Sequence, residues 1–225
     1  MKSVTFFTEH KEDTMNIVIF GASGTIGQCI TREALTRGHK VTAVVRNPRH
    51  IQIEQPHLTV QEGSVLNTAS IAQKVKGQDA VISAFGPPHD QSPQTLVEAA
   101  HALLNGLTQA DTRRLIVVGG AGSLEVAPGL LLMDQPSFPA AWRPVALAHS
   151  DALAIYRTSP LDWTYFSPAD MIEPGQRTGT YRTGTNQLVV DAQGKSRIST
   201  EDFAVAILDE LEQPHFIRQR CTVAY

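Results

Sequence analysis

Three glycines follow a short apolar run near the start of the sequence, in the order Gly21-Ala22-Ser23-Gly24-Thr25-Ile26-Gly27. The run before them, Asn16–Phe20, is typical of a buried strand, and Ile26, Ile30 and Ala34 repeat at helical spacing. In such a strand-turn-helix unit, the first glycine makes the tight turn, the second lets backbone approach a pyrophosphate, and the third allows close packing. The sequence therefore predicts that a dinucleotide is held at Gly21, Ser23, Gly24, Thr25, Ile26 and Gly27.

The second predicted strand, Lys40–Val45, ends at Arg46. Folds that select NAD place an Asp or Glu at this point to bind the ribose hydroxyls. A guanidinium can instead pair with the 2′-phosphate of NADP, and no carboxylate is present to repel that phosphate. The alternative is a surface arginine before the Asn47-Pro48 turn, and arginine also tolerates NAD. We expect NADPH as cofactor, with NAD left open.

Two further loops follow predicted strands, Gly63-Ser64-Val65 after Leu58–Glu62 and Ala84-Phe85-Gly86 after Ala80–Ser83. Ligands of open α/β sheets bind at the carboxyl ends of the strands. We therefore assign Ser64, Val65, Ala84, Phe85 and Gly86 to the adenosine side of the cofactor. Ser64 departs from the Gly-Asp-Val often found there, which weakens the case for an adenine contact.

Candidates for the reaction itself follow the strand Leu115–Val118, in the segment Gly119-Gly120-Ala121-Gly122-Ser123. Gly119 and Gly120 are expected beside the cofactor, and Ser123 stands where short-chain dehydrogenases carry a catalytic serine. Ser123 would orient a substrate or the nicotinamide. The alternative is a turn serine that satisfies local backbone.

The Tyr-x-x-x-Lys pair of those enzymes is missing, because Tyr156 is followed four residues later by Pro160, and His149 by Leu153. No lysine is available to lower a tyrosine pKa for acid catalysis, which argues against alcohol or sugar redox chemistry by the usual route. His149 is expected to begin a helix, where it either faces the nicotinamide or is structural. Ser123 and His149 are thus the catalytic candidates.

The elements that must position these residues alternate between short apolar runs and helical patterns, which is typical of βαβ units and a parallel sheet. Further strands are predicted at Trp163–Phe166 and Thr222–Tyr225, and a helix with an apolar face at 96–107. Ser199-Thr200-Glu201-Asp202 resembles a capping box before a last helix, and Pro174–Lys195 reads as a loop or small hairpin on the substrate side. We predict an α/β fold, a single Rossmann-type doubly wound parallel sheet with helices on both faces.

Length and composition suit one domain, with residues 1–14 as a polar extension and residues 15–225 as the domain. A net charge of −3 without a basic stripe argues against nucleic acid. Cys29 and Cys221 lack metal or redox spacing, the histidines, including His89, lack ligand partners, and no signal peptide or membrane-spanning run is seen. We expect no metal, no membrane, a cytoplasmic location, and a monomer or homodimer.

Five segments in order, 21–27, 45–48, 119–123, 162–168 and 199–204, make the chain resemble atypical short-chain reductases. Within them it is most similar to the NADH-flavin reductase group, near biliverdin reductase B and the NmrA-like proteins. The resemblance implies a reduced nicotinamide near Ser123 and Pro168, below a loop formed by the residues after Pro168.

The same resemblance implies an NAD(P)H-dependent oxidoreductase that passes a hydride to a planar acceptor such as a flavin (FMN or FAD) or a quinone. Such acceptors spread the charge and can take a proton from solvent, so stacking and alignment can replace a dedicated acid. The alternative is an NmrA-like regulator that senses NAD(P) without turnover. An isomerase or epimerase is least favoured, because the Tyr-x-x-x-Lys pair is absent.

Overall fold

Runs of β-branched and aromatic residues form the centre of the molecule, as the alternating sequence pattern predicts. The computed structural model describes residues 14–88 and 91–225, so residues 1–13 of the predicted extension at 1–14, and His89, lie outside the described residues. Eight strands form one sheet: β1 (Asn16–Phe20), β2 (Lys40–Val45), β3 (Leu58–Glu62), β4 (Ala80–Ser83), β5 (Arg114–Val118), β8 (Asp162–Ser167), β10 (Arg182–Gly184) and β12 (Gln219–Ala224). Their order is β10-β12-β8-β5-β4-β1-β2-β3, and every pairing is parallel except β10 with β12.

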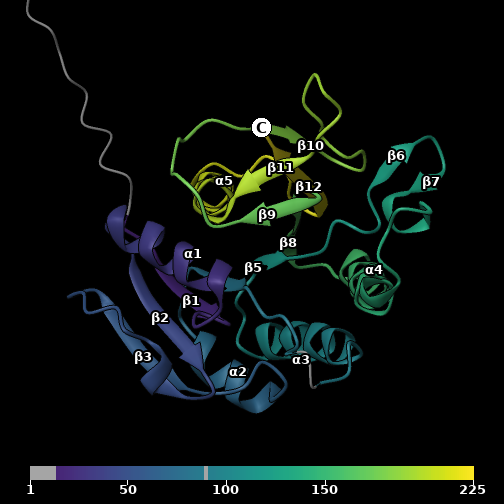
Figure 1. Cartoon of the computed structure of the whole chain (residues 1–225). Coiled ribbons are helices and arrows are strands. Elements are labelled where there is room, and N and C mark those ends of the chain that lie inside the picture. The colour runs from purple at the N-terminus through teal and green to yellow at the C-terminus, as the bar shows by residue number, and fades with distance from the viewer. Residues whose placement is uncertain (1–13, 89–90) are drawn as a thin grey trace, which may run out of the picture.

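Helices cover both faces of this sheet (Figure 1). On one face α1 (Thr25–Thr36) and α5 (Thr200–Glu212) lie side by side; α2 (Thr68–Val75), α3 (Thr95–Gln109) and α4 (Arg143–Arg157) cover the other. Neighbouring residues of one strand therefore enter different cores: Ile17 and Ile19 join the α1/α5 core, while Val18 and Phe20 join the α2/α3/α4 core. The predicted doubly wound α/β fold is confirmed.

The order of the strands reverses beside β1, which is the feature that positions a ligand. The chain runs outward from β1 through β2 to β3, then crosses back to place β4 on the other side of β1. The loops after β1 and β4 leave the sheet in opposite directions, and a crevice opens between them at the carboxyl edge.

No helix among the described residues is long and apolar enough to cross a membrane.

The structure corrects several sequence-based boundaries. Helix α4 begins at Arg143, so His149 lies in its middle rather than at its start. The segment Pro174–Lys195, predicted as a loop or hairpin, contributes the edge strand β10, which pairs with β12. The three residues of β10, Arg182-Thr183-Gly184, show no alternation of apolar residues that would predict a strand. They form one only because they pair with the free edge of β12. Two short pairs, β9 (Met171–Glu173) with β11 (Arg197–Ser199) and β6 (Glu125–Ala127) with β7 (Leu130–Leu131), lie outside the sheet.

Only half of the predicted capping box forms at α5. The Ser199 hydroxyl accepts from the N–H of Asp202 at 3.0 Å, as expected of an N-cap. The Asp202 carboxylate does not return to Ser199 but accepts from Thr178, Gly179 and Tyr225. It therefore ties the segment before β10 to the start of α5, and these acceptor bonds keep the pKa of Asp202 below its ordinary value against the opposing effect of burial.

A buried ion pair fastens α5 to the sheet. Glu210, 4% exposed, accepts from Arg114 at 3.0 Å and from the Thr164 hydroxyl at 2.9 Å. The N–H groups of His215 and Phe216 also donate to its carboxylate. Removing the carboxylate would leave the Arg114 charge without its partner in a low-dielectric environment.

We therefore expect Glu210→Ala to lower the free energy of unfolding by about 3–5 kcal/mol, because it strands a buried guanidinium. Asp134→Ala is the matched control: it breaks the exposed Asp134–Arg143 pair and should cost less than about 1 kcal/mol. Urea titration followed by circular dichroism measures both. Equal losses in the two variants would contradict this role for Glu210.

Candidate functional site

The glycine turn after β1 is shaped by backbone contacts that exclude a Cβ atom. Gly21 has φ +77°, and a Cβ on it would lie 2.5 Å from the carbonyl oxygen of Ala84. A Cβ on Gly27 would lie 2.1 Å from the carbonyl oxygen of Gly21. At Gly24 the corresponding distance is 3.5 Å, an ordinary contact. Packing thus requires the first and third glycines, while the second is exposed at the surface, where a ligand can approach.

The start of α1 carries unopposed positive charge. Its N-cap is Gly24, which offers no side-chain cap, and no acidic residue lies in the first turn. The first N–H groups of a helix have no acceptor within the helix, and the macrodipole adds a partial positive charge there. Gln28 donates to the carbonyl oxygen of Ser23 at 2.9 Å and holds the turn in place. This end of α1 suits a pyrophosphate.

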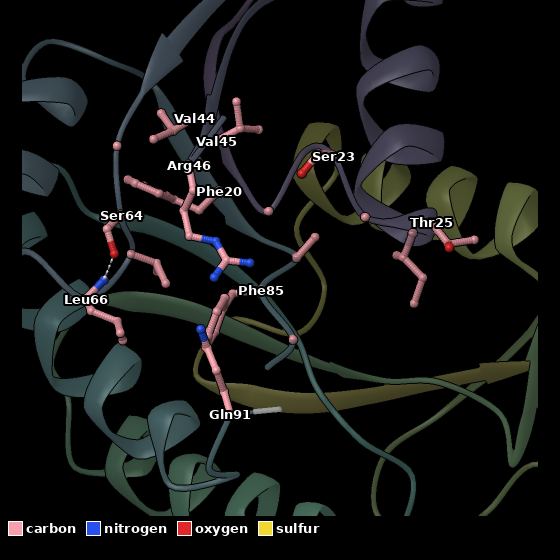
Figure 2. A pocket seen from close by; sticks show the side chains of 17 residues that line it. Phe20, Ser23, Thr25, Val44, Val45, Arg46, Ser64, Leu66, Phe85 and Gln91 are labelled. Atoms are coloured by element: carbon pink, nitrogen blue, oxygen red, sulfur yellow. Dashed lines mark hydrogen bonds between the residues drawn. The ribbon is translucent and has the colours of Figure 1, made fainter. Parts of the chain in front are cut away.

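A cavity of about 470 Å³ opens in front of this turn, between the carboxyl ends of β1, β2, β3 and β4. Figure 2 shows the Arg46 side chain extending into it above Phe85. Arg46 is the only charged residue among the described residues that line it. It takes part in none of the ion pairs among residues 14–88 and 91–225. The cavity is therefore suited to an anionic ligand.

Most residues predicted from the sequence to bind the cofactor meet at this cavity. Those that line it are Gly21, Ser23, Gly24, Thr25, Ile26, Arg46, Ser64, Val65, Ala84, Phe85 and Gly86. Phe20, Val44, Val45, Gly63, Leu66 and Gln91 also line it, although the sequence analysis did not select them. Strand position could have suggested Phe20, Val44 and Val45, since Phe20 and Val45 end their strands at the carboxyl edge and Val44 precedes Val45, whereas Gln91 carries no recognisable motif.

Ser64 has a local role in its loop. Its hydroxyl accepts from the N–H of Leu66 at 3.2 Å, as the dashed line in Figure 2 shows. Such side-chain turns are also made by aspartate, the residue expected at this position. The serine therefore preserves the loop at the cavity wall without adding a negative charge.

Six predicted site residues lie outside this cavity: Gly27, Gly119, Gly120, Ser123, His149 and Pro168. Gly27 packs under the turn, and Pro168 is buried directly after β8. Gly119 and Gly120 are required by packing. A Cβ on Gly119 would lie 2.0 Å from the Tyr165 ring, and one on Gly120 would lie 2.9 Å from the His149 ring.

His149 is bonded to the tyrosine beneath that loop. The Tyr165 hydroxyl donates to the carbonyl oxygen of His149 at 2.9 Å, and the Nδ1 of His149 lies 3.1 Å from the same hydroxyl. Because the hydroxyl has one hydrogen, Nδ1 carries a proton and donates to the tyrosine oxygen. Burial lowers the pKa of His149 to about 4, so the ring is neutral at pH 7. These contacts favour the structural role that the sequence also allowed.

Tyr156 is unavailable for acid catalysis. It is 2% exposed in the core and packs against Tyr165, with 6.0 Å between ring centroids. Burial raises its pKa above the ordinary value, so its hydroxyl holds its proton more strongly. Its aromatic ring contributes to the core rather than to a site.

Ser123 is contacted by a residue that the sequence analysis missed. Nη1 of Arg220, on β12, donates to the Ser123 hydroxyl at 2.9 Å and to its carbonyl oxygen at 3.0 Å. The predicted last strand began at Thr222, two residues beyond Arg220, so no pattern selected this arginine.

Among the residues that the structure describes, no group of three or more His, Cys, Asp or Glu could hold a metal.

The fold and this cavity define a Rossmann-type dinucleotide-binding protein. Residues 21–214 match the family described as NAD(P)H-binding. The chain belongs to this NAD(P)H-binding, oxidoreductase-like family.

Several solved structures are similar to this protein over almost the whole chain. A candidate exported protein of Burkholderia pseudomallei is 48% identical with a TM-score of 0.86, covering 94% of this chain and 100% of its own. A candidate epimerase of Bacteroides thetaiotaomicron is 42% identical with a TM-score of 0.87, covering 94% and 97%. A candidate NADH-flavin reductase of Streptococcus pneumoniae is 32% identical with a TM-score of 0.83, covering 93% and 99%.

The glycine geometry predicts that two similar substitutions will have different effects. Gly27→Ala should destabilise the fold by more than about 3 kcal/mol, because its Cβ would overlap backbone that cannot move aside. Gly24→Ala should change stability by less than about 1 kcal/mol yet weaken dinucleotide binding at least about tenfold, since its methyl group stands where a ligand approaches. Thermal unfolding and calorimetric titration with NADP⁺ measure the two effects. Equal unfolding losses would contradict the assignment.

Proposed function

We propose that the protein is an NAD(P)H-dependent reductase that passes a hydride to a flavin, a quinone or a similar planar acceptor. The observation that carries this proposal is the cavity at the glycine turn, whose only described charged residue is Arg46. Membership of the NAD(P)H-binding family supports it.

The chain's own residues suggest how the cofactor would be held. The turn from Gly21 to Gly27 and the N-terminus of α1 would bind the pyrophosphate, and Arg46 the 2′-phosphate of NADP. Ser64, Val65, Ala84, Phe85 and Gly86 would surround the adenosine. Gly119, Gly120, Ser123 and Pro168 would border the nicotinamide, which supplies a hydride when bound.

The proposed class of acceptor rests on two arguments, the lack of an acid catalyst at the site and the description of one relative. Tyr156 is buried, and His149 is neutral at pH 7, so neither supplies the acid that carbonyl reduction requires. Planar conjugated acceptors need alignment more than a protein acid, because they can take their proton from solvent. The Streptococcus pneumoniae relative is described as a candidate NADH-flavin reductase, which supports the same class.

The same lack of an acid favours a second candidate, a regulator that binds NAD(P) without turnover and acts on a protein partner. We further propose a cytoplasmic monomer or homodimer without metal. The Burkholderia pseudomallei relative, described as a candidate exported protein, makes cell fractionation a useful test of location.

Turnover separates the two candidates. Purified protein is mixed with NADPH and either FMN or menadione, and the loss of reduced nicotinamide absorbance is followed. A reductase should raise the rate at least about tenfold over the uncatalysed background, whereas a regulator should bind NADP⁺ in calorimetry and leave the rate unchanged. A rate equal to background with every acceptor would overturn the proposed function.

Cofactor choice is tested at Arg46. Arg46→Glu should weaken NADPH binding about 10- to 100-fold relative to NADH, because it removes a charge-assisted bond and repels the 2′-phosphate. Arg49→Glu is the matched control, since Arg49 is exposed nearby but does not line the cavity. Fluorescence titration with both nucleotides gives the ratio of affinities. If that ratio is the same in wild type and Arg46→Glu, Arg46 does not bind the phosphate.

A further inference from the structure

Arg220 is a buried arginine that forms no ion pair with any of the described residues. It is 7% exposed, and none of the ion pairs found among residues 14–88 and 91–225 includes it. Its Nε and Nη2 donate to Oδ1 of Asn186 at 3.2 and 3.0 Å, and Nη1 donates to Ser123. All of these hydrogen bonds go to neutral oxygens, and burial lowers the pKa of Arg220, although the Glu125 carboxylate lies near enough to oppose that shift. A buried charge that is hydrogen-bonded only to neutral groups is costly, which suggests a role beyond packing.

Two orphaned hydroxyl groups lie on the same face of the sheet. Arg220 pairs with Tyr165 and Thr222 pairs with Ser167 across β12 and β8, so the four side chains share one face. Ser167 and Thr222 are completely buried, and their hydroxyl oxygens have no hydrogen-bond partner among the described residues. Buried polar atoms normally find partners. This face is thus polar at the carboxyl end of β8 and at the β12 residues beside it, although it is apolar at Trp163.

The contact with Arg220 decides what the Ser123 hydroxyl can do. A hydroxyl has one hydrogen and two lone pairs, and a guanidinium can only donate. Ser123 must therefore accept from Arg220, which leaves its own hydrogen for another oxygen. No acceptor for that hydrogen is found among the described residues. A neighbouring cation also polarises the hydroxyl and makes it a stronger donor.

We propose that Arg220 is a positioning residue that orients the Ser123 hydroxyl to donate to a carbonyl oxygen of the acceptor, and that its charge favours the ionised form of that oxygen. The identity of the acceptor rests on the proposed function. Ser123 keeps its own proton, and the protonation of the reduced acceptor is left to solvent. The site then selects acceptors whose conjugated ring carries an oxygen, as flavins and quinones do.

A purely structural role for Arg220 would be to tie the turn at Ser123 to the segment at Asn186. A phenol probe distinguishes the two roles, because a phenolate oxygen resembles the oxygen of a reduced acceptor. para-Nitrophenol is titrated into wild type saturated with NADP⁺, and its phenolate absorbance is recorded against pH. The pKa of the bound phenol should fall about one pH unit or more below its value in water, a tenfold preference for the ionised form.

Three variants assign that preference. Arg220→Met and Ser123→Ala should each abolish most of it, while Arg220→Lys should restore part, because it keeps the charge without the planar fork. In the double variant the losses should be less than additive, since the two residues act through one hydrogen bond. Arg113→Met is the matched control: it removes an exposed arginine at the opposite end of the sheet and should leave the preference unchanged.

A wild-type circular dichroism spectrum and a cooperative thermal transition show that each variant is folded, and Ser123→Ala with Arg220→Lys carries the test if Arg220→Met does not fold. The proposal is overturned if wild type does not bind the phenol or binds the phenol and the phenolate equally. It is also overturned if Ser123→Ala and Arg220→Lys both keep the full wild-type preference for the phenolate. Turnover of wild type with menadione is measured separately. Turnover without phenolate preference rejects the Arg220 role alone, whereas no turnover with any acceptor rejects the proposed reductase.

Discussion

The carbonyl oxygen of Gly21 lies where a Cβ on Gly27 would have to stand, and Gly21 itself leaves no room for a Cβ beside Ala84. These two approaches bring the start of α1 down onto the end of β1 and hold the β1 loop against the β4 loop. The helix N-terminus consequently points into the crevice where the strand order reverses. The cavity in front of the glycine turn, the helix N-terminus beside it and the position of Arg46 all depend on this backbone contact.

Charge is distributed unevenly around that framework. On the α1/α5 face, Glu33 pairs with both Arg37 and Arg177, and Arg37 also bonds Glu212. These charges neutralise one another and hold helices and loop together. At the carboxyl edge, by contrast, Arg46 and Arg220 form no ion pair with any of the described residues. The same edge thus has a positive charge at each of two places, one in the cavity at the glycine turn and one beside Ser123.

Side chains that resemble catalytic groups in the sequence are used here for packing. Tyr165 fills the space beneath Gly119 and fixes the proton of His149, while Tyr156 lies in the core behind it. The ionised forms of all three are disfavoured by burial. Residue type therefore gives a poor guide to chemistry in this part of the chain, and the polar contacts of Ser123 give a better one.

The sequence by itself determined β1 to β4, the glycine turn and most residues that line the cavity beside it, because strand period and glycine spacing are local signals and neighbouring parallel strands end at one edge. It also led to the family through short motifs. Only the tertiary structure decided the start of α4, the pairing of β10 and the surroundings of His149. The contact of Arg220 with Ser123 joins residues 97 positions apart. Such contacts depend on which strands become neighbours and on which hydrogen-bond partners the buried polar groups find. Residues far apart in the sequence decide both, so no local sequence pattern predicts them.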